Sequence, residues 1–148
     1  MVTLPKKSTF PDAEQDVCDY VDEMLKPVTP EIKAYTYLPN MTTSDLDDGK
    51  AFVLVQRVGG IANYSQRAVD MAIIELTVVA ATRMDSWEIL GYLRDCFYEA
   101  ASGVEAGGSR IVSVKETSGP SEMMFADPKQ RAVKFLFQIG IRRKTRRI

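Results

Sequence analysis

The stretch that decides the fold lies close to the end of the chain and reads Val133-Lys-Phe-Leu-Phe-Gln-Ile-Gly-Ile141. Large apolar side chains recur at every second position, which predicts a half-buried strand with Phe135 and Phe137 on its core face. A basic cluster follows at once, made of Arg142, Arg143, Lys144, Arg146 and Arg147. Because the cluster begins where the strand leaves the core, we expect the sheet to hold cations there for an anionic partner, either nucleic acid, another protein or a second copy of the chain.

Apolar patterns in the rest of the chain predict two helices and four further strands. A helix is expected over residues 12–25, with Pro11 suited to a first helical position, and a second one from an N-cap at Asp85 to about residue 102. Strands are expected at 32–38, 51–58, 71–81 and 111–117, before the last one at 132–142. Loops are expected at 40–50 and 103–109, a strand end at Gly59-Gly60, a turn at Ser118-Gly119-Pro120 and an irregular segment at 121–130.

The connections decide the fold class. Those between strands are too short for helical crossovers, apart from the one that holds the second helix. We therefore expect residues 1–148 to form a single α+β domain in the order α-β-β-β-α-β-β, with a mainly antiparallel sheet of about five strands and two helices on one side. The strand at 71–81 is apolar on both faces in its second half, so further helices or a neighbouring subunit would cover the other face.

The formal net charge is −1, but it is unevenly distributed. Residues 1–50 hold 5 lysines against 10 acidic residues, 5 − 10 = −5, which leaves −1 − (−5) = +4 for residues 51–148. An uneven charge suits head-to-tail association, in which the acidic part of one copy meets the basic part of the next. The candidate subunit or partner contacts are the basic cluster, with 142–148 as a basic C-terminal tail, and the acidic group Asp45, Asp47 and Asp48.

Composition excludes most catalytic and metal chemistry. The chain has no histidine, so Ser-His-Asp catalysis, Cys-His catalysis and histidine-ligated metals are excluded. Cys18 and Cys96 lie far apart and are expected to be buried, reduced thiols. The run from Asp45 to Gly49 resembles the start of a calcium loop, but position twelve is Gln56 where a glutamate is needed. We expect no cofactor and no metal.

The candidate catalytic acids are Asp70, Glu75, Asp85 and Asp127. No spacing forces two of them together, and no serine has a histidine partner, so we do not expect an enzyme. No apolar run approaches the roughly 20 residues of a membrane span, and no apolar segment follows the first residues as in a signal peptide. A soluble intracellular protein without a membrane partner is the simplest expectation.

The basic tail keeps a nucleic-acid-binding module open as an alternative. Binding of single strands also needs exposed aromatic side chains beside the cations, whereas Phe135 and Phe137 alternate as core residues. A net charge near zero further disfavours a free DNA-binding protein.

An ordered set of segments resembles the tail-terminator proteins of long-tailed, lambda-like bacteriophages. The set comprises the acidic first helix, the strand Phe52–Val58 leading to a glycine, Arg67-x-x-Asp70 opening a strand that ends in Val79-Ala-Ala-Thr-Arg83, the helix from Trp87, Gly119-Pro120, and a last strand ending in Arg142-Arg143. The resemblance covers nearly the whole domain.

This resemblance implies a structural virion protein that forms a ring, expected to be a homohexamer. The ring would cap the completed tail tube, end its polymerisation and join the tail to the head-completion proteins, with DNA passing through its lumen. It would be assembled in the host cytoplasm and lie at the head–tail joint. Neck or head-closure connector proteins share this kind of domain and stay open as an alternative. Residues 40–50 and 121–130 are the expected contact loops.

Overall fold

The computed structural model describes residues 1–5, 9–64, 68–122 and 131–144 of the chain. In chain order its elements are α1 (Ala13–Leu25), β1 (Lys33–Tyr35), α2 (Thr43–Asp47), β2 (Phe52–Ala62), β3 (Asp70–Val79), α3 (Arg83–Ala100), β4 (Val104–Ala106), β5 (Ser109–Glu122) and β6 (Ala132–Arg143). Within these ranges, no helix combines the length and the apolar character that crossing a membrane requires.

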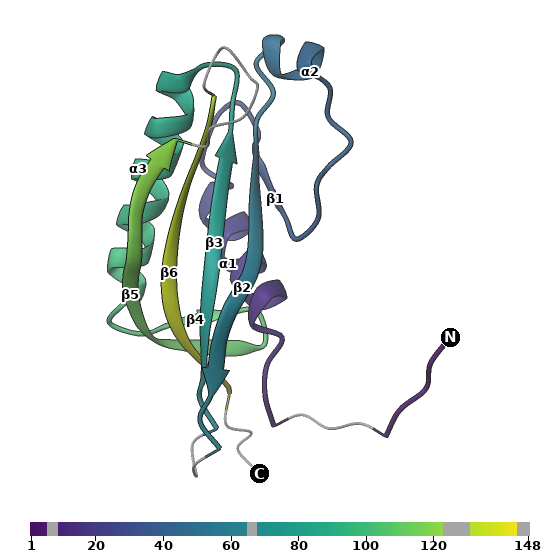
Figure 1. The fold of residues 1–148 in the computed structure, drawn as a ribbon, viewed down its shortest axis with the longest axis vertical. Helices are drawn as coiled ribbons and strands as arrows, with labels where there is room; N and C mark the ends of the chain where they lie inside the picture. The colour runs from purple at the N-terminus through teal and green to yellow at the C-terminus, as the bar shows by residue number, and fades with distance from the viewer. Residues whose placement is uncertain (6–8, 65–67, 123–130, 145–148) are drawn as a thin grey trace.

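One sheet of six strands organises the molecule, in the order β1-β2-β3-β6-β5-β4 (Figure 1). The short edge strand β1 runs parallel to β2, and every other neighbouring pair is antiparallel. The central pair β3 and β6 is in register from Asp70 opposite Ile141 to Val79 opposite Ala132. The prediction of one α+β domain with a mainly antiparallel sheet is therefore confirmed, and the described residues form six strands and three helices where about five strands and two helices were expected.

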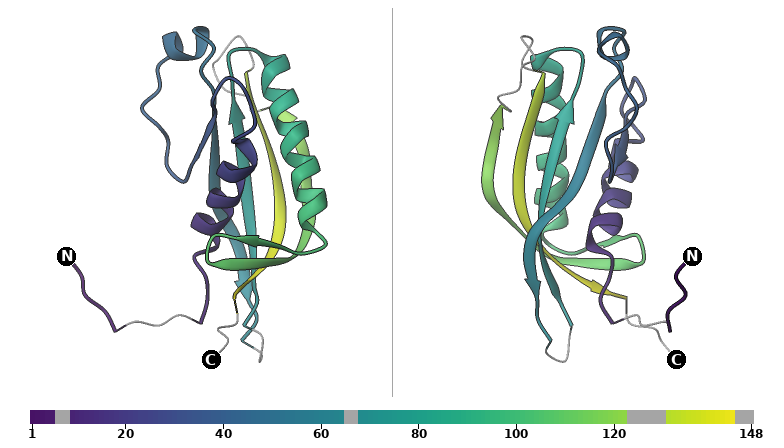
Figure 2. Two further views of the ribbon diagram at one scale, coloured as in Figure 1. Left: turned by 180° about the vertical axis from the view of Figure 1, so that it is seen from behind. Right: turned by 45° about the vertical axis from the view of Figure 1, so that its right-hand side comes forward.

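The core lies between this sheet and two helices. Figure 2 shows α1 and α3 side by side on one face of the sheet. The alternating residues of β6 point toward them, and Phe135 and Phe137 are almost fully buried. Phe97 of α3 packs on both rings, with its centroid 4.3 Å from that of Phe137. The alternating apolar side chains of the stretch at 133–141 are all buried, so this stretch lies in the core. Each large apolar side chain contributes roughly 1.5–3 kcal/mol when buried, so the stretch is also a main source of stability.

Both long helices begin at side-chain caps. The carboxylate of Asp12 accepts a hydrogen bond from the Gln15 amide, so α1 starts one residue after the cap and Pro11 lies outside it. The hydroxyl of Thr82 accepts one from the Asp85 amide at 3.1 Å. The predicted N-cap at Asp85 was wrong, because Thr82 occupies the extended position before the first turn and Asp85 lies inside it.

Several predicted loops carry secondary structure. The loop at 40–50 contains α2, and the loop at 103–109 contains β4, which pairs with the start of β5. Strand β2 continues past Gly59-Gly60, which follow a bulge at Val58 and pair with Ile73 and Ala72. The predicted turn at Ser118-Gly119-Pro120 was also wrong, because β5 runs through it with shifts of register against β6. Pairing with a long neighbouring strand overrides local turn signals in both places.

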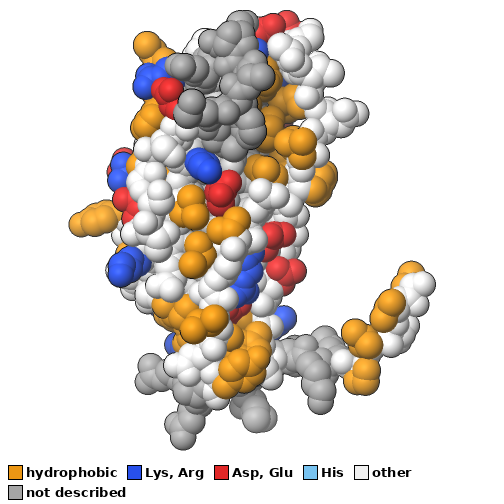
Figure 3. Space-filling view, viewed as in Figure 1, with side chains coloured by type: hydrophobic (Ala, Val, Ile, Leu, Met, Phe, Trp, Pro, Cys, Tyr) orange, Lys and Arg blue, Asp and Glu red, His pale blue; other side chains and the backbone are white. Residues whose placement is uncertain are grey.

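The face of the sheet opposite α1 and α3 carries no helix among the residues that the structure describes (Figure 2). Figure 3 views the molecule from this side and shows hydrophobic side chains at its surface. Leu54, Ile73 and Leu136 lie on this face and are half-buried. Coverage of this face by a neighbouring subunit stays a prediction.

Candidate assembly surfaces

The acidic group Asp45, Asp47 and Asp48, which we call the acidic pole, lies on α2 and its C-cap at one end of the molecule (Figure 1). Asp45 forms a capping box with Thr42 and also contacts Lys50 at 3.2 Å. The hydrogen bond from the Thr42 amide, followed by the one from Lys50, lowers the pKa of the Asp45 carboxyl. A helix of this length needs such caps, so Asp45 is structural as well as acidic.

A buried arginine ties the acidic pole to the sheet. Arg131, whose side chain is 4% exposed, donates a hydrogen bond to Asp47 at 3.0 Å just before β6 begins. The Arg131 carbonyl in turn accepts a hydrogen bond from the Ser86 hydroxyl of α3. Asp47 is therefore fixed to the core, whereas Asp48 makes no ion pair within the described part of the chain. The sequence gives no local signal for Arg131, because its partners lie 45 and 84 residues away.

The opposite end of β6 carries a basic pole, which consists of Arg110, Arg142, Arg143 and Lys144. Arg110 of β5 stands directly opposite Arg142, so two like charges share one rung of the sheet. Glu105 lies opposite Arg110 and pairs with Lys144 at 3.0 Å. Arg143 donates to the carbonyl of Phe10 at 3.3 Å. Glu105 thus lies beside two cations of the pole, and the Asp16 carboxylate of α1 also lies nearby, where it accepts a hydrogen bond from the Ser109 hydroxyl. Arg110 was missed because it joins the pole only through strand pairing.

Arg146 and Arg147 lie outside the described residues. The other members of the predicted contact set fall at two separate places. Strand β6 connects the two places: Arg131, which binds Asp47, directly precedes its first residue, and Arg143 is its last residue. The 12 residues of β6 span about 36–40 Å along the strand. The acidic and basic groups therefore do not meet within one copy of the chain.

The β2–β3 hairpin extends beyond the body of the molecule at the basic end (Figure 1). Arg57 clamps its base through two parallel hydrogen bonds to the buried carboxylate of Asp70, at 2.5 and 2.8 Å. Beyond the clamp, Ile61 is 80% exposed and Tyr64 is 85% exposed, although Tyr64 contacts the ring of Phe10. The end with the cations therefore also offers apolar side chains to a partner.

The candidate acids that the structure describes, Asp70, Glu75 and Asp85, do not form a catalytic pair. Asp70 is engaged with Arg57, Glu75 is half-buried within β3, and Asp85 is exposed in the first turn of α3. Asp127 lies outside the described residues. In the ranges that the structure covers, no three acidic or cysteine side chains gather to hold a metal ion. Both cysteines are buried free thiols, and burial raises the pKa of Cys18 to about 11.

Comparison with known proteins identifies the family. None of the curated proteins matches this sequence. Residues 9–147, nearly the whole chain, match the model of a family described as phage tail termination protein. The match includes both poles, the hairpin and all strands of the sheet. The chain therefore belongs to the phage tail termination protein family, and its role is a structural one in the bacteriophage tail.

Proposed function

We propose that the protein forms a closed ring, a homohexamer, that caps the completed tail tube, ends its polymerisation and joins the tail to the head-completion proteins. Membership of the tail termination family supports this proposal. The observation that carries it is the position of two oppositely charged poles at the two ends of one sheet.

If the ring axis is parallel to the strands, the two poles of each copy lie at opposite ends along the axis. Rotation about such an axis keeps every acidic pole on one face of the ring and every basic pole on the other. The two faces then carry opposite charge and accept different partners, because complementary charge favours one partner and repels the other. A terminator needs this polarity, since its tube side and its head side bind different proteins.

The basic pole also suits a lumen through which DNA passes. Arg142, Arg143 and Lys144, continued by Arg146 and Arg147, would contact phosphates or an acidic partner without reading sequence. Phe135 and Phe137 are buried, so they are not available to stack on bases, which disfavours the alternative of a single-strand-binding module. A neck or head-closure role would use the same two faces with other partners.

The test is assembly of tail tubes from purified tail-tube protein, with and without this protein. We expect substoichiometric addition to stop elongation, and electron microscopy to show a ring at one end of each tube. Replacement of Arg142 and Arg143 by Glu should weaken attachment on one face of the ring about tenfold or more, while the exposed Lys26→Glu serves as the matched control. Tubes that elongate unchanged, with no ring at either end, would overturn the proposal.

A further inference from the structure

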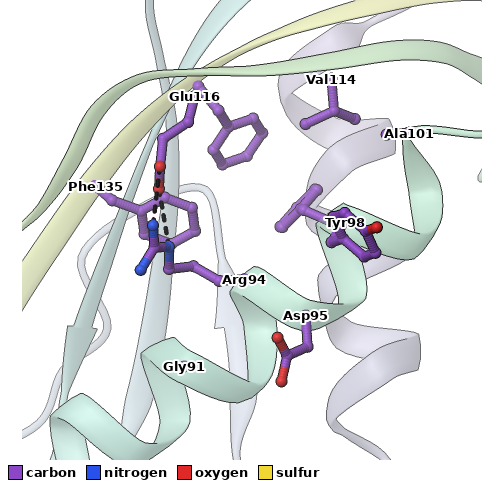
Figure 4. A pocket seen from close by; sticks show the side chains of 10 residues that line it. Gly91, Arg94, Asp95, Tyr98, Ala101, Val114, Glu116 and Phe135 are labelled. Carbon is purple, nitrogen blue, oxygen red and sulfur yellow. Dashed lines mark hydrogen bonds and ion pairs between the residues drawn. The ribbon is translucent and has the colours of Figure 1, made fainter.

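A groove runs between α3 and β5 on the helix side of the sheet (Figure 4). It has a volume of about 520 Å³. Phe97, Phe135 and Phe137 form its apolar floor, and Arg94 and Glu116 reach across it from its two walls as an ion pair at 2.9 Å. Figure 4 shows Tyr98 and Gly91 along the helical wall. The three phenylalanines are almost fully buried, so the apolar surface that the groove offers comes from Tyr98, which is 84% exposed, and from the half-buried Val114.

The strand beside the groove has an open edge. β4 pairs only with Ser109–Ile111, so β5 has no strand partner on that side from Val112 to Glu122 within the described residues. Unpaired backbone groups on an edge strand favour association with another chain. An apolar groove and an open edge thus lie together on one side of the molecule.

The opposite edge of the sheet presents exposed apolar side chains. There β1 ends after Tyr35, and the next residues include Tyr37, which is 66% exposed, and Leu38, which is 73% exposed. The ring of Tyr37 packs edge-on against that of Tyr35 at 5.6 Å. This contact holds Tyr37 beside the sheet, although neither Tyr37 nor Leu38 contributes to the core.

The sheet register places the end of β1 close to the height of the groove, and the chain continues from there to Tyr37 and Leu38. Tyr35, the last residue of β1, lies opposite Leu54 of β2. The next rungs of the sheet lead from Val55 and Arg57 of β2 across β3 to Phe135 and Phe137 of β6, which line the groove. Strand direction alternates from β2 through β3 and β6 to β5, so β1 and β5 are antiparallel. Rotation about an axis along the strands therefore brings the β1 edge of one copy to the β5 edge of the next in antiparallel orientation and at a similar height.

We infer that Tyr37 and Leu38 of one copy insert into the groove between α3 and β5 of the neighbouring copy, and that this contact closes the ring. The inference rests on the ring of the proposed function and specifies its lateral interface. Such a contact is heterologous, because a projection on one edge fills a hollow on the other, and contacts of this kind close into rings. A second copy of this chain is the occupant because the same molecule carries both halves at a similar height.

The test uses two variants of the full chain. Tyr37→Ser combined with Leu38→Asp removes the projection, and Gly91→Trp fills the groove, since a Cβ at Gly91 meets no atom within 4 Å. Matched controls are Met84→Asp, at a side chain 68% exposed in the first turn of α3, and Gly108→Trp, at an open glycine outside the groove. Circular dichroism checks that all four are folded, and native mass spectrometry gives the oligomeric state, with tail-tube protein present if the wild type assembles only there.

We expect each interface variant to lose the ring, with association weakened about 30-fold or more as at interface hot spots, and both controls to keep it. An equimolar mixture of the two interface variants should form a one-to-one dimer and nothing larger, because only one intact projection and one intact groove then meet. Rings formed by either variant, or a mixture that stays monomeric, would overturn the inference. Rings that form normally but do not cap tubes would instead contradict the proposed function.

A disulfide gives an independent test in the assembled state. Leu38→Cys combined with Ala101→Cys places one thiol on the projection and one at the rim of the groove. Both native thiols are buried and have raised pKa values, so background reaction should be slow. A ladder of covalent oligomers up to the ring is expected without reductant. Its absence in rings that mass spectrometry detects would contradict this interface.

Discussion

At the scale of single residues, the clamp between Arg57 and Asp70 determines whether the β2–β3 hairpin is held. The carboxylate is buried and accepts two hydrogen bonds, and this contact raises the pKa of Arg57. Asp70→Asn should lower the free energy of unfolding by about 2–3 kcal/mol, because it leaves a partly buried guanidinium without its counter-charge.

Urea denaturation at neutral pH measures this loss. The control is Glu23→Gln, which breaks the exposed ion pair with Lys26 and should cost no more than about 0.5 kcal/mol. Equal effects of the two substitutions would show that the clamp is no stronger than a surface pair.

Cys18 and Tyr20 of α1 give the protein a stability loss at alkaline pH. Burial, followed by nearby carboxylates for Cys18, raises the pKa of the thiol from 9.0 to about 11, and burial raises that of Tyr20 from 10.0 to about 12. At a pH between the ordinary pKa of each group and its raised pKa in the native state, the unfolded chain has released a proton that the native state retains. Stability is therefore full below about pH 9 and falls as the pH rises toward 11 and 12.

Urea midpoints measured from pH 8 to 11 should show this decline. Cys18→Ala removes the first of the two groups, so its decline between pH 9 and 11 should be shallower than that of the wild type. An identical slope in the variant would exclude Cys18 as its source.

At the scale of elements, α3 depends on its Thr82 cap. Thr82→Ala should lower the free energy of unfolding by about 1 kcal/mol, because the Asp85 amide loses its acceptor. Asp85→Asn should change it by only a few tenths of a kcal/mol through the helix dipole. Thermal unfolding of both variants measures the difference. A larger loss of stability in Asp85→Asn than in Thr82→Ala would show that Asp85 is the cap.

Gly60 tests the bulged part of the hairpin. Its φ is +97°, and a Cβ there would lie 2.1 Å from the Met71 carbonyl oxygen, so Gly60→Ala should cost about 2 kcal/mol or more. Gly119→Ala in β5 is the control, because nothing lies within 4 Å of a Cβ there. Chemical denaturation of both variants gives the comparison, and a neutral effect of Gly60→Ala would mean that the hairpin relaxes around the new methyl group.

The elements also show how far the sequence predicts this fold. Alternation in 133–141 and the helical periodicity around Phe97 identify the core correctly, because burial acts on every second strand residue and on one helical stripe. The continuation of β2 through Gly59-Gly60 and of β5 through Gly119-Pro120 was not predictable, since a neighbouring strand, rather than the local residues, decides it. The same limit applies to the candidate surfaces, because Arg110 and Arg131 acquire their places only through distant partners.

At the scale of the whole molecule, the separation of the poles makes a prediction about charge reversal. Arg142→Glu with Arg143→Glu should weaken attachment to a partner about tenfold or more and leave the mass of the ring unchanged. Asp48→Lys should not restore attachment, because in the proposed ring the two poles face different proteins. Native mass spectrometry and co-sedimentation with tubes, in a double-mutant cycle, measure both effects. Restoration by Asp48→Lys would instead mean that the acidic pole of one copy contacts the basic pole of the next.

Strand β6 runs between both poles and is hydrogen-bonded on both sides, to β3 and to β5. If the ring stands as proposed, with one pole toward the head and the other toward the tube, a tension between head and tube would pull along this strand, at right angles to its hydrogen bonds. Both ladders would then be loaded in shear, with many bonds sharing the force at once, whereas a pull across the sheet would open them one after another. In the proposed ring, the fold would therefore be mechanically strongest along the direction that connects the head to the tail.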